Sequence, residues 1–326
     1  MIEILLKEWI ERVKYYIHLI ADYSIKESQV GAVLDDVLNL SGKMLRSKLL
    51  LLCAFLGTNW KNNKEKICKL AAMVELTHLA SLIHDDIVDD SPYRRGKVSI
   101  QGKYGKDAAV FAGDFLIARI FYYGAVENLN EAVSILSKTV EYMCIGEIEQ
   151  DLCRYQENIS EKKYFENIER KTAALFQAAS YIGAKEAGCS EEIIQKLELF
   201  VKNLGLMFQL KDDILDFTSN SKELGKETHK DFQNGIYTFP VIMALKNPKA
   251  REVLLPIMRK NKEEKLSLAE ILQLQNYIIQ FGGIEASYEK IKYLSNINRQ
   301  LIKELGQNSK ITVYLEKILN DLEVEN

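Results

Sequence analysis

The sequence predicts an all-α protein, and three observations support this. Only four of the 326 residues are proline, whereas average usage of about 5% would give roughly 16. None occurs between Pro92 and Pro240, and proline costs about 3 kcal/mol inside a helix. Apolar residues recur at helical spacing, and no long stretch alternates between apolar and polar residues as a strand would. We therefore expect about a dozen helices and no substantial sheet.

Several helices can be placed along the chain. Leu5, Trp9 and Val13 share one face of a first helix, and an apolar stripe from Leu70 to Ile83 marks a later one. Residues that cap a first turn predict three helix starts: Asn130 before Glu131, Ser190 before Glu191, and the capping box of Ser267 with Glu270. Glycines predict helix ends or entries: Gly42, Gly57, Gly105, Gly188 and Gly282–Gly283. The polar stretch 218–239 is predicted to be a lid.

The composition is that of an ordinary soluble globular protein. Apolar residues make up 47% and charged residues 27%, and the net charge is 43 − 46 = −3, without the basic excess of a nucleic-acid binder. Charged Glu3 and Lys7 argue against a signal peptide, and the longest apolar run, 49–56, is too short to span a bilayer. Five scattered cysteines indicate reduced thiols and a cytoplasmic location. No linker or repeat divides the chain, so one domain over 1–326 is expected.

Two segments, 83–91 and 210–218, repeat one aspartate pattern. Their aspartates lie at positions i, i+1 and i+4: Asp85, Asp86 and Asp89, then Asp212, Asp213 and Asp216. On a helix, i and i+4 share a face, where two carboxylates repel unless a cation lies between them. Oxygen ligands of this kind suit Mg²⁺, whose coordination substrate phosphates complete. A solvated acidic face would explain one such motif equally well, but two motifs flanked by apolar residues favour metal sites.

Basic residues lie near these aspartates in sequence. The clearest are Arg94, Arg95, Lys43, Arg46, Lys171 (followed by Thr172) and Lys226. Arginine binds phosphate oxygens bidentately and lysine supplies a point charge. Each alone would be ordinary surface charge; together with two metal sites they predict a cavity for two diphosphate groups.

The strings HLASLIHDDIVDDSPYRRG and FQLKDDILDF resemble the two aspartate-rich motifs of the trans-prenyl diphosphate synthases (polyprenyl synthetases). SGKMLRS resembles the family's GGKxLRP, AGDFLIAR its AGDxLLAR, RKTAALF its KTA/KTG segment and NGIYTFP its GxxTLP. The resemblance implies the all-α isoprenoid-synthase helical bundle, with both motifs facing each other across a central cavity. It also implies transfer of an allylic carbocation, formed when the C–O bond of an allylic diphosphate ionises, to isopentenyl diphosphate, followed by loss of a proton.

The resemblance also implies roles for individual residues. Mg²⁺ ions, three per active site, would be held by Asp85, Asp89 and Asp212, with Asp86, Asp213 and Asp216 in or near the coordination shell. The allylic phosphates would be bound by Arg94, Lys171, Thr172, Gln209 and Lys226, beside a wall at Phe208. Isopentenyl diphosphate would be bound by Gly42, Lys43, Arg46, His78 and Arg95. His84 is expected to support or pack.

After the second aspartate motif, the chain departs from the family pattern at two positions. Ile236 stands where the family usually has Lys or Asn, and His229 stands where a glycine is expected. One phosphate-binding cation is therefore missing, and Lys230 is the candidate to replace it.

Small residues one turn before Asp85, Ala80 and Ser81, predict a long product, because aromatic residues there mark farnesyl- and geranylgeranyl-forming members. With about 5.4 Å per helix turn, the growing chain would pass these residues and end deeper, at Val140 and Met143. ASLIHDD and GEIEQ resemble the large, catalytic component of heptaprenyl diphosphate synthase. This implies a C30–C40 product, heptaprenyl as the best match, for quinone side chains, and either a homodimer or a heteromer with a small non-catalytic subunit.

Three alternatives stay open. One is a short-chain farnesyl or geranylgeranyl diphosphate synthase. The second is a class I terpene cyclase, which carries a different second metal motif and does not need Lys43, Arg46 or Arg95. The third is a non-catalytic regulatory subunit, although such subunits commonly lose their aspartates and all six are present here.

Overall fold

The structure is a computed structural model that describes residues 2–22, 28–40, 42–94, 96–218, 230–306 and 310–323. It divides into two compact units. Unit 1 comprises Met1–Val140 with Leu175–Glu198, and unit 2 comprises Glu141–Ala174 with Leu199–Asn326. The predicted single domain over 1–326 stays a prediction.

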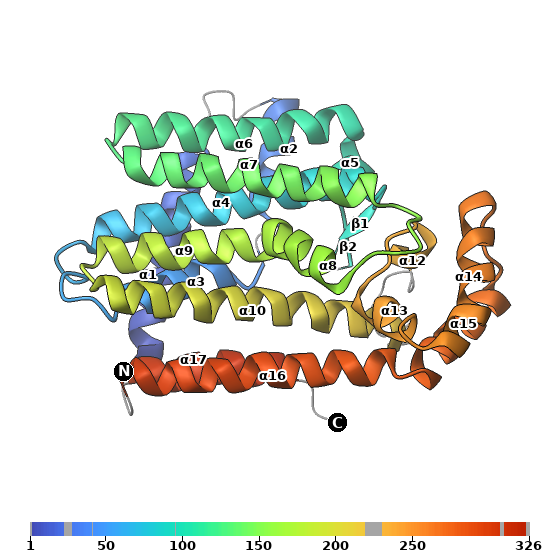
Figure 1. Cartoon of the computed structure of the whole chain (residues 1–326). Coiled ribbons are helices and arrows are strands. Elements are labelled where there is room, and N and C mark those ends of the chain that lie inside the picture. The colour runs from blue at the N-terminus through green and yellow to red at the C-terminus, as the bar shows by residue number, and fades with distance from the viewer. Residues whose placement is uncertain are drawn as a thin grey trace. The chain divides into compact units, whose positions relative to one another are not determined.

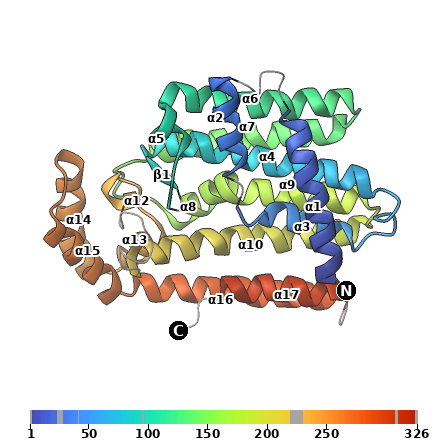
Figure 2. The same ribbon diagram turned by 180° about the vertical axis from the view of Figure 1, so that it is seen from behind.

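Unit 1 is built around one long apolar helix. Its helices are α1 (Ile2–Ile20), α2 (Gln29–Leu38), α3 (Leu45–Ala54), α4 (Lys64–Val88), α5 (Ile100–Tyr104), α6 (Lys106–Val126), the first part of α7 (Asn130–Leu152), α9 (Ala174–Glu186) and the start of α10 (Glu191–Thr218). α4 contacts α1, α3, α5 and α6 (Figure 1), and α1 lies across α3 and α4 (Figure 2). Because α4 is surrounded, most of its residues are buried and it lacks the polar face of a surface helix.

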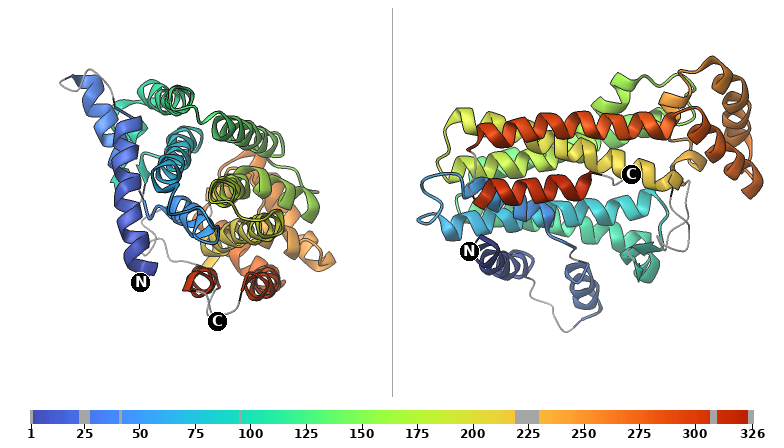
Figure 3. Two further views of the ribbon diagram at one scale, coloured as in Figure 1. Left: turned by 90° about the vertical axis from the view of Figure 1, so that its left-hand side faces the viewer. Right: turned by 90° about the horizontal axis from the view of Figure 1, so that it is seen from below.

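Unit 2 carries the remaining elements. These are the rest of α7 and α10, then α8 (Glu161–Ile168), the π-helix η1 (Glu169–Ala173), α12 (Lys230–Gln233), α13 (Phe239–Ala244), α14 (Pro248–Glu263), α15 (Leu268–Gln280), α16 (Gly283–Glu304) and α17 (Lys310–Leu322). α13 packs on α8, α15 and α16, and α17 lies along α16 (Figure 3).

The all-α prediction is confirmed. The capping box of Ser267 and Glu270 is present at the start of α15, and Ser190 accepts a hydrogen bond from the Ile193 amide at the start of α10. In the described residues, the sheet consists of one hairpin, β1 (Tyr93–Arg94) with β2 (Lys97–Val98). A strand of two residues is too short to show the alternation of apolar and polar residues from which strands are predicted. Half of the predicted lid, positions 219–229, lies outside the described residues.

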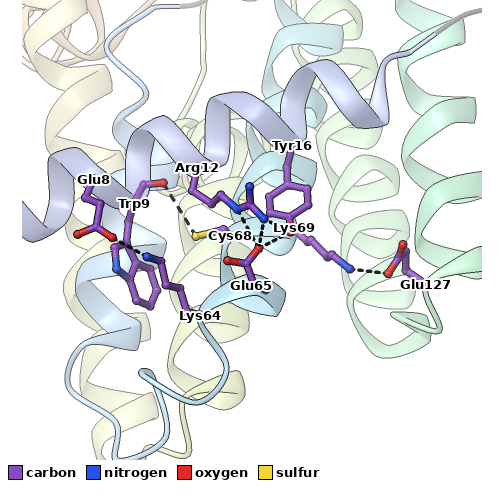
Figure 4. A network of polar contacts seen from close by, with 9 residues as sticks. All are labelled: Glu8, Trp9, Arg12, Tyr16, Lys64, Glu65, Cys68, Lys69 and Glu127. Atoms are coloured by element: carbon purple, nitrogen blue, oxygen red, sulfur yellow. Dashed lines mark hydrogen bonds and ion pairs between the residues drawn. The ribbon is translucent and has the colours of Figure 1, made fainter.

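A polar network fastens α1 to α4 (Figure 4). Arg12 Nε and Tyr16 OH both donate to Glu65 Oε2, at 2.8 and 2.5 Å. Lys64 reaches Glu8 at 2.6 Å. Burial is the main cause that raises the pKa of Tyr16 to about 12, so its hydroxyl stays a donor. Of the apolar face predicted for α1, Trp9 and Val13 are buried and Leu5 is half-buried.

In the part of the chain that the structure describes, two helices, α4 and α6, are long and apolar enough to cross a membrane by length and composition alone. For α4, 72% of the apolar window is buried within the structure. Core helices of soluble proteins meet the same criterion.

Candidate active site

The first aspartate motif occupies the last turn of α4 in unit 1. Asp85 is half-buried, Asp86 is 3% exposed, and Asp89 is exposed. The Asp89 amide caps the helix by donating to the Asp85 carbonyl at 2.9 Å. The i, i+4 pair therefore lies at the accessible end of the helix, and the middle aspartate points into the protein.

Arg94 holds the buried Asp86. Its Nε lies 2.8 Å from Asp86 Oδ1 and 2.9 Å from Oδ2. The hairpin that follows α4 brings Arg94 back to the helix, with Gly96 at φ +76° in its turn. Among the described residues, the two terminal amino groups of Arg94 make no hydrogen bond, so they are free to bind an anion. Arg95 lies outside the described residues.

His84 packs against α6. Its Nε2 lies 3.3 Å from the Val110 carbonyl and 3.5 Å from Asp114. A Cβ added at Gly113 would lie 2.2 Å from that nitrogen. The AGD segment thus provides the space that His84 occupies beside Asp85, in agreement with the packing role expected for it.

The second motif lies near the end of α10, in unit 2. Asp212 is exposed, Asp213 is 1% exposed, and Asp216 is half-buried. In both motifs the middle aspartate is buried and the i, i+4 pair is more accessible, but the exposed end is Asp89 in the first motif and Asp212 in the second.

A chain of hydrogen bonds fixes Asp213. Tyr164 OH donates to its Oδ2 at 2.5 Å, and Gln209 Nε2 donates to its Oδ1 at 3.0 Å. Thr172 Oγ1 in turn donates to Gln209 Oε1 at 3.0 Å. Burial raises the pKa of Asp213 to about 7, although the bonds from Tyr164, Gln209 and the Phe239 amide lower it. Burial and the nearby Asp213 carboxylate raise the pKa of Tyr164 well above its usual value.

Lys171 and Thr172 lie in the π-helix η1, between α8 and α9. π-Helical turns often occur at functional sites because they redirect side chains within a helix. Lys171 Nζ pairs with Glu147 of α7 at 2.9 Å. α7 approaches closely at Gly146, where an added Cβ would lie 3.0 Å from the Lys171 amide nitrogen.

These groups border a pocket within unit 2. Its wall includes Lys163, Lys171, Gln209, Asp213 and Ile236. Ile236, the departure noted in the sequence, therefore lies on the same pocket as three of the predicted site residues. Phe208, the predicted wall residue, is half-buried. Lys226 and His229 lie outside the described residues.

Gly42, Lys43, Arg46 and His78, which are predicted to bind isopentenyl diphosphate, lie in unit 1. Gly42 and Lys43 are exposed just before α3, and His78 is half-buried on α4. The Arg46 guanidinium lies 4.5 Å from the centre of the Phe176 ring. A cation over an aromatic face is attracted to it, which restricts where the guanidinium points.

The chain-length candidates fall on α4 and α7. Ala80 is fully buried, and Ser81 is half-buried with its hydroxyl donating to the His78 carbonyl at 2.8 Å. Val140 and Met143 are half-buried, and they fall in different units. Their roles stay predictions, as does the facing arrangement of the two motifs.

Two contacts of the predicted site residues have no motif in the sequence. Tyr164 is 49 residues from its partner Asp213. The one feature of the sequence that could have pointed to Tyr164 is its spacing of seven residues, about two helix turns, before Lys171. The bond from Arg94 to Asp86 was likewise not predicted. Within the described residues, no group of three or more His, Cys, Asp or Glu side chains forms a ready metal cage.

Comparison with known proteins places the chain in a family. The polyprenyl synthetase family model matches residues 27–275. Heptaprenyl diphosphate synthase component 2 of Geobacillus stearothermophilus is 34% identical over 265 residues, which cover 80% of each chain.

Two crystal structures share the fold. A polyprenyl synthase from Caulobacter crescentus CB15, complexed with calcium and isoprenyl diphosphate, superposes with a TM-score of 0.87 at 29% identity, covering 98% of this chain and 96% of that one. Geranylgeranyl pyrophosphate synthase from Lactobacillus brevis ATCC 367 superposes with a TM-score of 0.87 at 25% identity, covering 98% and 97%. The chain belongs to the polyprenyl synthetase family of trans-prenyl diphosphate synthases and is a prenyltransferase.

Proposed function

We propose that this chain condenses isopentenyl diphosphate with an allylic diphosphate, in a Mg²⁺-dependent reaction, to give a long all-trans polyprenyl diphosphate. The observation that carries this proposal is the shared organisation of the two motifs. In each, the middle aspartate is buried and held by protein partners, while the i, i+4 pair is more accessible. A metal site at the end of a helix needs accessible carboxylates as ligands and buried, hydrogen-bonded residues beside them that fix their orientation.

The donor set fits Mg²⁺. Asp85 with Asp89, and Asp212 with Asp216, offer only carboxylate oxygens, and Mg²⁺ binds one or two carboxylates while water and substrate phosphates complete its octahedron. Since the described residues contain no cage of three or more ligating side chains, a site completed by substrate suits them. When bound, Mg²⁺ would neutralise charge that develops on the departing diphosphate. We assign Asp86 and Asp213 the task of orienting these pairs.

The basic residues would hold the two substrates. Arg94 and Lys171 would bind the allylic diphosphate, whose negative charge increases as the C–O bond ionises. Thr172 and Gln209 would orient Asp213 through their hydrogen-bond chain. In unit 1, Lys43 and Arg46 would bind isopentenyl diphosphate. Apolar residues such as Phe208 would exclude water, which would otherwise quench the carbocation.

We infer a product of about six to eight isoprene units, with heptaprenyl diphosphate as the best match and quinone side chains as its destination. The small Ala80 and Ser81 support this, because one helix turn is close to the length of an isoprene unit. So does the name of the Geobacillus relative. A geranylgeranyl or farnesyl product is the second candidate, since a geranylgeranyl synthase shares the fold equally well.

The assembly is also part of the proposal. The relative named component 2 supports a heteromer with a small non-catalytic subunit, and the resemblance supports a homodimer. We place the enzyme in the cytoplasm.

The test incubates the pure chain with farnesyl diphosphate, radiolabelled isopentenyl diphosphate and Mg²⁺, followed by product chromatography. We expect labelled C30–C40 products that disappear with EDTA. The Asp85→Ala and Asp212→Ala variants should each lose most of the turnover. Activity that survives EDTA or both variants would contradict the metal assignment, and a C15 or C20 product would favour the short-chain candidate.

A further inference from the structure

Ser47 is a buried side chain that departs from the family pattern. It ends the SGKMLRS segment, where the resembling motif GGKxLRP has proline. It lies in the first turn of α3 and is fully buried. Proline has neither an amide N–H nor a hydroxyl, so a proline at this position could not donate the bonds that Ser47 donates.

Both donors of Ser47 reach one carboxylate of α4. The Ser47 amide lies 3.4 Å and its hydroxyl 2.9 Å from Glu75 Oε2. The hydroxyl also lies 3.0 Å from the Ala71 carbonyl, so its single proton serves one of these two acceptors at a time. Glu75 is itself only 7% exposed. A carboxylate in such a position depends on hydrogen bonds for its stability.

The first turn of α3 needs such a partner. The first four amides of a helix have no acceptor within the helix, and a side chain at the N-cap usually supplies one. Here the N-cap is Met44, whose side chain makes no such bond and whose φ is +52°. A non-glycine residue in the left-handed region is strained and persists only where its surroundings hold it. The Glu75 carboxylate meets the need from a neighbouring helix, and its negative charge suits the N-terminal end of α3.

Arg46 immediately precedes Ser47, so the same turn carries a predicted ligand of isopentenyl diphosphate. Its guanidinium is held over Phe176 at 4.5 Å. The turn is therefore fixed at two points, Ser47 on α4 and Arg46 on α9. If Ser47 is released, the turn that follows the exposed Gly42 and Lys43 loses one of these two anchors.

We propose that Ser47 is a positioning residue for isopentenyl diphosphate, acting through Glu75 to hold Arg46 and Lys43 in their binding orientation. This inference rests on the proposed function. It predicts a selective effect: affinity for isopentenyl diphosphate depends on the pair, whereas affinity for the allylic diphosphate does not.

The experiment compares KM for each substrate in Ser47→Ala, Ser47→Pro, Glu75→Ala and Glu75→Gln. Ser180→Ala is the matched control, because Ser180 is also a fully buried serine of unit 1, whose hydroxyl contacts Cys53 Sγ at 3.4 Å. We expect Ser47→Ala and Glu75→Ala to raise the KM for isopentenyl diphosphate about fivefold, the effect of losing an ordinary helix cap. The KM for the allylic substrate should stay constant. Glu75→Gln keeps an oxygen acceptor and should recover most of the loss.

An isopentenyl diphosphate KM in Ser47→Ala equal to that of the unchanged protein would overturn the proposal. So would an equal rise in both KM values, or the same rise in Ser180→Ala, because these indicate a general packing defect. Ser47→Ala decides the matter alone if Glu75→Ala does not fold. Calorimetry measures binding of isopentenyl diphosphate without turnover. If the unchanged chain binds isopentenyl diphosphate but does not condense it with the allylic diphosphate, the proposed function is rejected. The calorimetric affinities of the variants still test the role of Ser47 in that case.

Discussion

Protonation of Asp213 should make the stability of the metal-free protein depend on pH. Its pKa is raised to about 7 in the folded chain, first of all by burial, against an ordinary value of about 3.9 in an unfolded chain. The folded state therefore binds this proton more tightly than the unfolded state. The resulting stabilisation is complete below pH 4, falls as the pH rises toward 7, and is lost above it.

The size of the effect follows from the two pKa values. Between pH 5 and the folded pKa of about 7, the unfolded carboxyl is already ionised and the folded one is not. Two pH units at about 1.36 kcal/mol each give a loss of about 3 kcal/mol. Asp213→Asn cannot ionise but can still accept the bond from Tyr164, so it should lack this loss.

Urea unfolding in EDTA, at pH 5 and pH 8, measures the difference. The free energy of unfolding of the unchanged chain, minus that of Asp213→Asn, should fall by about 3 kcal/mol between the two pH values. Tyr164→Phe removes a bond that lowers the pKa of Asp213, so in that variant the loss should continue to higher pH. A difference between the unchanged chain and Asp213→Asn that is the same at both pH values would refute the reasoning.

Three further predictions concern packing and substrate. Gly113→Ala places a Cβ 2.2 Å from His84 Nε2 and should lower the free energy of unfolding by about 1–3 kcal/mol; His84→Ala should relieve that cost in the double variant, and additive effects would contradict the contact. Ala80→Tyr should shorten the product to about four units if each unit spans one turn, as chromatography would show, and an unchanged product profile would reject an open tunnel beside this residue. Lys230→Ala should raise the KM for the allylic diphosphate if Lys230 replaces the cation missing at Ile236. A KM equal to that of the unchanged chain would contradict this role.

Helical periodicity is a local property, and much of this protein could be inferred from it. The scarcity of proline and the spacing of apolar residues predicted the all-α fold, and the capping residues Ser190 and Ser267 predicted where α10 and α15 begin. The same periodicity placed Asp85 with Asp89, and Asp212 with Asp216, on common faces. The motifs that share these residues identified the family before any contact was known.

Tertiary structure decided which member of each aspartate motif is buried, because burial depends on elements that the local pattern does not contain. Asp86 is enclosed because a two-residue hairpin brings Arg94 back to α4, and Asp213 because Tyr164 arrives from a helix 49 residues earlier. Ser47 meets Glu75 across 28 residues for the same reason. Side-chain spacing along a helix says that the i, i+4 aspartates share a face and that the middle one does not, but it does not say what packs against either face. Only tertiary contacts, from the hairpin after α4 for Asp86 and from a distant helix for Asp213, separated the anchored aspartates from the more accessible ones.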